Sequence, residues 1–171
     1  MIVVTGKSGV GKTWALKQLK LNNVINIDQV VKSIMYRSPH QAFKQVKTAF
    51  GDQVLSTDKK TIDTKKLGQI VFKHPEDLKK LNSIMIFHIK SYLKTLPDNS
   101  IVELAIYMDH EHEFKALFSR VILITGQVHL KDKFKYLSHK FNPIYNSEIK
   151  HDFKFDNQDQ DLLKKLLNAL G

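Results

Sequence analysis

The sequence predicts an α/β fold: a three-layer α/β/α sandwich on a five-stranded parallel sheet, with a helical insertion between the second and third strands. Two observations support this. Short apolar segments alternate with longer helix-forming segments along the chain; the apolar segments are residues 2–4, 24–27, 101–106, 121–125 and 153–155. The first of them, Ile2-Val3-Val4, leads directly into a glycine-rich turn and then a helix-forming run, as a buried parallel strand would.

The turn from Gly6 to Thr13 contains a complete G-x-x-x-x-G-K-[ST] pattern. Between a strand and a helix this pattern is typical of a phosphate-binding loop, so we expect a P-loop NTPase fold. Glycines let the backbone approach an anion, and the N–H groups of the turn form a nest for phosphate oxygens. The expected nucleotide-binding residues of this stretch are Gly6, Ser8, Gly9, Val10, Gly11, Lys12, Thr13 and Trp14.

Two of these side chains have specific expected tasks. Lys12 is expected to reach the β- and γ-phosphates of ATP, and the Thr13 hydroxyl to coordinate Mg²⁺. Trp14 directly follows the turn, so it is expected near the phosphates, and packing is its alternative role.

Helices are expected where apolar residues recur at helical spacing without breakers. They cover residues 12–21, 29–35, 41–50, 64–72, 75–96, 113–118, 128–141 and 161–170. We interpret residues 1–171 as a single domain. Within it, the almost wholly helical block 38–97 is predicted to be a substrate-binding insertion, and residues 126–150 a lid-like region.

Two aspartates follow predicted strands. Asp28 ends the second strand and Asp109 follows the third. Parallel strands finish at one edge of the sheet, where ligands bind, so we expect both acids to face the phosphates. Asp28 could also cap the helix 29–35. Glu103, an acid within an apolar strand, is either a buried, paired residue or a second acid near the metal.

The run from Asp109 to Glu113 looks like a metal-binding sequence. Residues two apart do not share a helix face, so we interpret this run as an exposed loop.

The composition narrows the possible classes of protein. The 171 residues contain no cysteine, which excludes disulfides and thiolate metal sites. No apolar run is long enough for a membrane span, and no N-terminal signal precedes the loop, so a cytoplasmic protein is expected. The net charge is +10, but the lysines are spread along the chain and only Arg37 and Arg120 are arginine. We therefore expect a small nucleotide substrate and no nucleic-acid or membrane partner. The expected state is a monomer or small homo-oligomer.

Several segments, in order, resemble those of one family. Thr5 to Thr13 matches T-G-G-x-G-S-G-K-[ST], with Lys7 and Val10 as departures. Val24 to Asp28 is similar to V-I-D-A-D, with Asn26 in place of the first aspartate. Further similar segments are Phe50-Gly51, Leu67-Gly68, Val71-Phe72, Leu81-Asn82, Glu103 to Asp109 and Phe155-Asp156-Asn157. Together they resemble dephospho-coenzyme A kinase, a family of P-loop nucleotide kinases.

The resemblance implies transfer of the ATP γ-phosphoryl group to the ribose 3′-hydroxyl of dephospho-coenzyme A, the last step of coenzyme A biosynthesis. It implies that Asp28 and Lys12 are catalytic, with Asp28 accepting or orienting the proton of the attacking hydroxyl. It further implies that Asn157 contacts ATP. The implied substrate-binding residues are Asp109, Tyr107 and Phe72.

The sequence departs from the family pattern where the family uses arginine. Thr64 stands at one arginine position, and the lid-like region carries Lys131, Lys133, Lys135 and Lys140 instead. Lysine does not reproduce the bidentate grip of arginine on phosphate. Two alternatives therefore stay open: another small nucleoside or nucleotide kinase, and a non-catalytic nucleotide-binding module.

Overall fold

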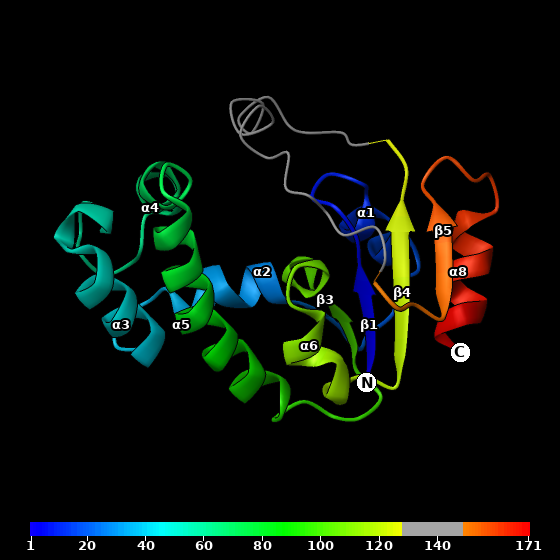
Figure 1. Ribbon diagram of the computed structural model, residues 1–171. Helices are drawn as coiled ribbons and strands as arrows, with labels where there is room; N and C mark the ends of the chain where they lie inside the picture. Colours follow the sequence, from blue (N-terminus) through cyan, green and yellow to red (C-terminus); the bar gives the residue numbers. More distant parts are fainter. Residues whose placement is uncertain (128–148) are drawn as a thin grey trace. The chain divides into compact units, whose positions relative to one another are not determined.

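The computed structural model describes residues 1–127 and 149–171, which include a five-stranded sheet (Figure 1). The strands are β1 (Ile2–Thr5), β2 (Val24–Asn26), β3 (Ile101–Glu103), β4 (Arg120–Thr125) and β5 (Phe153–Asp156). Their order is β2-β3-β1-β4-β5, and every neighbouring pair is parallel. The predicted α/β fold with a five-stranded parallel sheet is confirmed.

Both faces of the central strand β1 are covered. Val3 and Val4 point to opposite faces, and both are 0% exposed. On one face, α1 (Lys12–Gln18) and α8 (Leu162–Leu170) pack on the sheet. The buried residues of this layer form one cluster: Val4, Val10, Ala15, Leu16, Ile101, Ile122, Ile124, Leu162, Leu166 and Ala169. The phosphate-loop residue Val10 thus belongs to the core, which anchors the loop.

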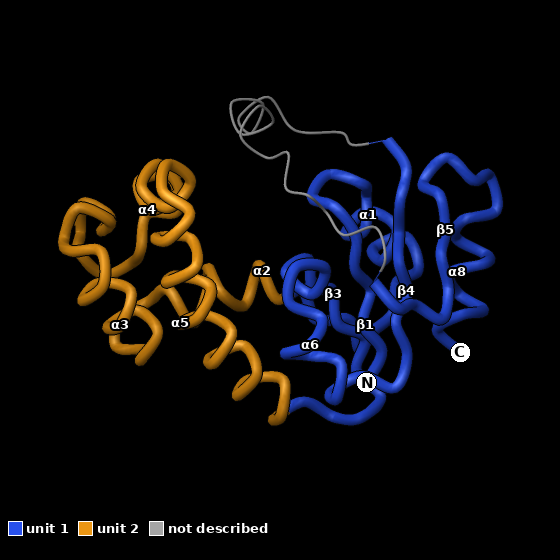
Figure 2. Tube along the Cα trace, in the orientation of Figure 1, with its two compact units in different colours: residues 1–26, 96–171 blue, residues 27–95 orange. Residues whose placement is uncertain are grey.

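The chain divides into two compact units (Figure 2). Unit 1, residues 1–26 and 96–171, holds the sheet together with η3 (Ala105–Met108), α6 (Glu111–Phe114) and η4 (Lys115–Leu117). Unit 2, residues 27–95, contains α2 (Ile27–Val30), η1 (Val31–Met35), α3 (Gln41–Phe50), η2 (Asp52–Val54), α4 (Thr64–Val71) and α5 (Pro75–Leu93). The predicted insertion 38–97 overlaps unit 2, and its substrate-binding role stays a prediction.

Local sequence signals set the helix starts in unit 2. The Asp63 side chain accepts hydrogen bonds from the backbone N–H groups of Lys65 and Lys66, at 2.9 and 3.2 Å, and so caps α4. Helix α5 begins at Pro75, where the missing N–H costs no hydrogen bond. Its buried face includes Leu81, Met85, Ile86, His88, Ile89 and Leu93. Leu78, Ile84 and Tyr92 of the same helix are only half-buried.

Two predicted strand ends were wrong. The second strand ends at Asn26 and the third at Glu103, earlier than expected. Asn26 is the register partner of Glu103, which is in turn the partner of Val4. After Glu103 the chain turns into η3, although β1 continues to Thr5, whose hydroxyl donates to the carbonyl oxygen of Leu104 at 2.9 Å. Asp28 accordingly lies in the first turn of α2, and neither ends a strand nor caps a helix.

Other predicted boundaries also shift. The first helix ends at Gln18, the predicted helix 29–35 is a short α-helix followed by a π-helical turn, and the predicted helix 113–118 is split between α6 and η4. The predicted helix 128–141 lies outside the described residues, as does most of the lid-like region 126–150 with its four lysines.

Among the described residues, no helix combines the length and apolar character that crossing a membrane requires.

A buried histidine in unit 2 makes stability depend on pH. His88 is 7% exposed, and its Nε2 donates to Oε1 of Gln45 at 2.8 Å. Burial, with a smaller effect of the neighbouring His40, lowers the pKa of His88. The unfolded chain therefore takes up a proton more readily, and stability falls as the pH drops below the ordinary value of 6.5.

We expect His88→Gln to remove part of this pH dependence, because an amide can still bond to Gln45 but does not titrate. Urea unfolding at about pH 7.5 and about pH 5.5 measures the pH dependence of the free energy of unfolding. One unit of pKa difference between the folded and unfolded states corresponds to about 1.4 kcal/mol. His112→Gln, on an exposed side chain, is the control. An unchanged pH slope in His88→Gln would contradict the assignment.

Candidate functional site

The phosphate loop between β1 and α1 adopts the backbone conformation that its glycines permit. Gly9 and Gly11 have φ of 87° and 89°, in the left-handed region that favours glycine. At Gly6 an added Cβ would lie 2.1 Å from the carbonyl oxygen of Ile124 in β4. The loop therefore lies directly against the neighbouring strand, and this approach leaves no space for a side chain.

The side chain of Lys12 folds back onto the loop that precedes it. Its residue is only 5% exposed, and its Nζ donates hydrogen bonds to the carbonyl oxygens of Gly6 and Lys7, both at 2.8 Å. These contacts place a positive charge at the centre of the turn, among the glycine peptides. A buried ammonium needs such partners, because burial without hydrogen bonds is costly.

Glu103 joins three elements of unit 1. Its Oε1 accepts a hydrogen bond from Oγ1 of Thr13 at 2.5 Å, and its Oε2 accepts one from Nδ2 of Asn26 at 2.5 Å. Glu103 is 8% exposed. The acid thus lies at the end of β3, beside the first turn of α1 and the end of β2. Of the two interpretations of Glu103, the structure shows the buried, paired residue, and its position beside Thr13 leaves a metal-site role open.

Strand order explains why Glu103 is the acid beside the loop. Strand β3 lies between β1 and β2, so the strand next to the loop ends in Glu103. Asp28, two residues beyond Asn26, belongs to unit 2. Sequence reasoning singled out Glu103 as an acid in an apolar strand, but without the strand order it could not assign the partners.

The other predicted site residues of unit 1 have different surroundings. Tyr107 is 1% exposed, its ring packs edge-on against Phe118, and burial, with smaller effects of nearby acids, raises the pKa of its hydroxyl to about 12. Asp109 directly follows η3. Loss of hydration raises the pKa of its carboxyl, and His110 has a smaller effect that lowers this pKa. The burial of Tyr107 indicates that its ring stabilises the core. Substrate contacts by either residue stay a prediction.

Three further predicted site residues have separate positions. Trp14 in α1 is 58% exposed. Phe72 follows α4 in unit 2 and contacts Gly68. Asn157 follows β5, and its side chain bonds to the backbone of Val10 and Gln127. The structure therefore brings Asn157 to the phosphate loop, along with Lys12, Thr13 and Glu103.

The histidine-rich run at residues 109–113 forms no metal site in the structure. Glu111–Phe114 is a helical turn, where a loop was expected. Among residues 1–127 and 149–171, no group of three or more histidine, aspartate or glutamate side chains is arranged to hold a metal ion.

Comparison with known proteins identifies the family. A protein-family model described as dephospho-CoA kinase (CoaE) matches residues 1–136. The chain belongs to the dephospho-CoA kinase family. The dephospho-CoA kinase of Lactobacillus acidophilus is 31% identical over 135 residues, which are 73% of this chain and 66% of that protein. The dephospho-CoA kinase of Mycoplasma pneumoniae is 28% identical over 132 residues, 72% of this chain and 64% of that one. The chain thus spans about two thirds of these relatives.

Solved structures support the fold. The crystal structure of TT1252 from Thermus thermophilus aligns with a TM-score of 0.63 at 17% identity, covering 99% of this chain and 94% of that one. The dephospho-CoA kinase from Campylobacter jejuni aligns with a TM-score of 0.53 at 21% identity, covering 99% and 96%. The architecture described above is therefore shared with solved structures, one of them a dephospho-CoA kinase.

The contact of Asn26 with Glu103 gives a test of the site's electrostatics. Asn26→Asp replaces an amide donor by a second carboxylate, and two adjacent carboxylates repel each other when both are ionised. We expect a loss of about 1–3 kcal/mol of stability at about pH 8, and a smaller loss at about pH 5, where one carboxyl of the pair is protonated. Denaturant unfolding at both pH values measures it.

Asn26→Ala is the matched control, because it removes the hydrogen bond without adding a charge. Its loss of stability relative to the native protein is expected to be similar at the two pH values. Equal pH dependence in the two variants would show that the introduced carboxylate is not held beside Glu103.

Proposed function

We propose that this protein is an ATP-dependent dephospho-CoA kinase, which transfers the γ-phosphoryl group of ATP to the ribose 3′-hydroxyl of dephospho-coenzyme A. One observation carries the proposal. In a member of this family, the phosphate loop holds Lys12 among its glycine peptides and sets the Thr13 hydroxyl against the Glu103 carboxylate. This combination offers a cation to phosphate oxygens and hard oxygen ligands to a metal.

The residues present fit a triphosphate with Mg²⁺. Hydroxyl and carboxylate oxygens are ligands that Mg²⁺ accepts, and it usually retains several of its waters. Thr13 would hold the ion directly and Glu103 would hold one of its waters. When bound, Mg²⁺ neutralises charge on the β- and γ-phosphates.

The chain's own residues supply the positioning on which phosphoryl transfer mainly depends. Loop N–H groups and the Lys12 ammonium would hold the β- and γ-phosphates. To do so, Lys12 exchanges its bonds to Gly6 and Lys7 for phosphate oxygens. Asp28 would orient the attacking hydroxyl and accept its proton. The helical block 38–97 would accept dephospho-coenzyme A, and Lys131, Lys133, Lys135 and Lys140 would cover the phosphates and exclude water.

The direct test is a coupled assay of ADP release with dephospho-coenzyme A as acceptor. A panel of nucleosides and nucleoside monophosphates serves as comparison. Phosphorylation of dephospho-coenzyme A at the 3′ position, above all other acceptors, supports the proposal. A preference for a nucleoside or nucleotide would identify another small kinase. ATP binding without transfer to any acceptor would identify a nucleotide-binding module.

Asp28→Asn tests the proposed base. The amide keeps the shape of the side chain but cannot accept the proton, so we expect kcat to fall about 10²–10⁴-fold. The dissociation constant of ATP should stay nearly unchanged, as measured by calorimetry. Asp98→Asn, on an exposed turn residue of unit 1, is the control. A kcat within a few-fold of the native value would remove Asp28 from the mechanism.

Glu103→Gln tests the metal site. The amide can still accept from Thr13 but carries no charge, so we expect about 10-fold more Mg²⁺ to be needed for half-maximal activity. Activity is titrated with Mg²⁺ at saturating ATP, and thermal unfolding shows whether the fold is retained. Glu76→Gln, in the first turn of α5, is the matched control. An unchanged requirement for Mg²⁺ in folded Glu103→Gln would limit Glu103 to a structural role.

A further inference from the structure

Asn157 lies where three segments of unit 1 meet. Its backbone N–H donates to the carbonyl oxygen of Thr125 at 2.9 Å, which continues the pairing of β5 with β4. Its side chain turns toward the phosphate loop and toward Gln127, the second residue after β4. Segments more than a hundred residues apart in sequence are therefore joined by one carboxamide.

Within residues 1–127 and 149–171, this carboxamide hydrogen-bonds to backbone atoms. Nδ2 donates to the carbonyl oxygen of Val10 at 3.2 Å and to that of Gln127 at 2.6 Å. Oδ1 accepts from the backbone N–H of Gln127 at 3.1 Å. An amide nitrogen has two hydrogens, and both are used here. This leaves no donor on the side chain for a nucleobase.

Gly126 is shaped to let Asn157 approach. Its φ is +113°, and an added Cβ would lie 2.1 Å from Oδ1 and 2.7 Å from Cγ of Asn157. Any side chain at residue 126 would displace the carboxamide. The close contact therefore depends on both residues: the carboxamide of Asn157 and the absence of a side chain at Gly126.

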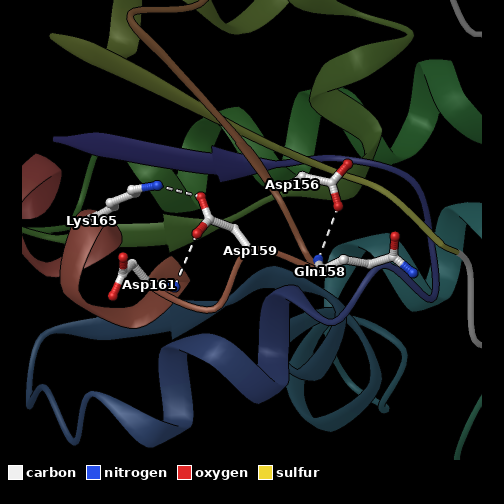
Figure 3. A network of polar contacts seen from close by, with 5 residues as sticks. All are labelled: Asp156, Gln158, Asp159, Asp161 and Lys165. Carbon is white, nitrogen blue, oxygen red and sulfur yellow. Dashed lines mark hydrogen bonds and ion pairs between the residues drawn. The ribbon is translucent and has the colours of Figure 1, made fainter.

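The turn that carries Asn157 is itself held in place (Figure 3). Asp156 Oδ1 accepts from the backbone N–H of Gln158 at 2.9 Å. Asp159 Oδ1 accepts from the N–H of Asp161 at 2.9 Å, and its Oδ2 accepts from Nζ of Lys165 in α8 at 2.6 Å. The carboxamide thus projects from a turn whose two ends are fixed by β5 and α8.

We propose that Asn157 is a positioning residue of the phosphate loop, which acts through the Val10 carbonyl and does not touch the nucleotide. In a trans peptide the C=O and the following N–H point in opposite directions. Holding the Val10 oxygen toward Asn157 therefore directs the N–H of Gly11 the other way, toward the side of the loop where phosphate is proposed to bind. This inference rests on the proposed phosphate site, and not on which acceptor is phosphorylated.

The two possible roles of Asn157 make opposite predictions for a ligand without a base. A residue that contacts adenine affects ATP binding but not inorganic tripolyphosphate. A residue that orients the loop affects both alike. Binding is measured by calorimetry with ATP and with tripolyphosphate. The fluorescence of Trp14, the only tryptophan of the sequence and 58% exposed next to the loop, serves as a second signal.

We expect Asn157→Ala to raise the dissociation constants of both ligands by the same factor, about 3- to 10-fold, as for the loss of a hydrogen bond. Asn157→Asp should do at least as much, because a carboxylate of the same shape cannot donate to Val10. Gly126→Ala should have the same effect by displacing the amide. Gln158→Ala keeps the backbone N–H that donates to Asp156 and should bind both ligands as the native protein does.

Thermal unfolding of each variant separates an effect on the loop from an effect on folding. If Asn157→Ala does not fold, Asn157→Ser and Gly126→Ala carry the test. Weaker ATP binding with unchanged tripolyphosphate binding would overturn the proposal in favour of a base contact. Unchanged binding of both ligands in a folded variant would overturn it in favour of a purely structural role. Because the binding experiment contains no acceptor, neither result depends on dephospho-coenzyme A being the substrate.

Discussion

The hydrogen bonds of Glu103 are the contacts on which the arrangement of unit 1 around the phosphate loop depends. One carboxylate accepts from Thr13 at the start of α1 and from Asn26 at the end of β2, while its backbone belongs to β3. Removing one of these donors would leave an oxygen of the buried carboxylate without its hydrogen bond, which costs free energy. The Glu103 side chain therefore connects β3 with the end of β2 and with the first turn of α1.

Much of the fold could be predicted because the signals are local. The apolar runs after Met1 and Arg120 indicated the central strands, and Pro75 with its two following acids indicated the start of α5. The glycine spacing from Gly6 to Gly11 predicted the loop. In each case the side chains concerned are neighbours in sequence, so the sequence contains the whole cause.

The errors arose where the cause lies in another segment. Leu104 to Ile106 is as apolar as a strand, yet β3 ends at Glu103 and the chain turns into η3. Strand β2, which pairs with β3, ends at the same level, at Asn26. The contacts of Glu103 with Asn26 and of Asn157 with Val10 likewise depend on strand order, since they join residues 77 and 147 positions apart. A single sequence gives no direct information on such pairs.

The carbonyl oxygens that hold Lys12 also bear on which anions the loop admits. An anion at the proposed site would compete for the ammonium with the main-chain oxygens of Gly6 and Lys7. A small ion of low charge, such as orthophosphate, competes less well than a polyphosphate chain that also spans several loop N–H groups. At the proposed phosphate site, these hydrogen bonds of Lys12 would therefore favour a polyphosphate chain over free orthophosphate.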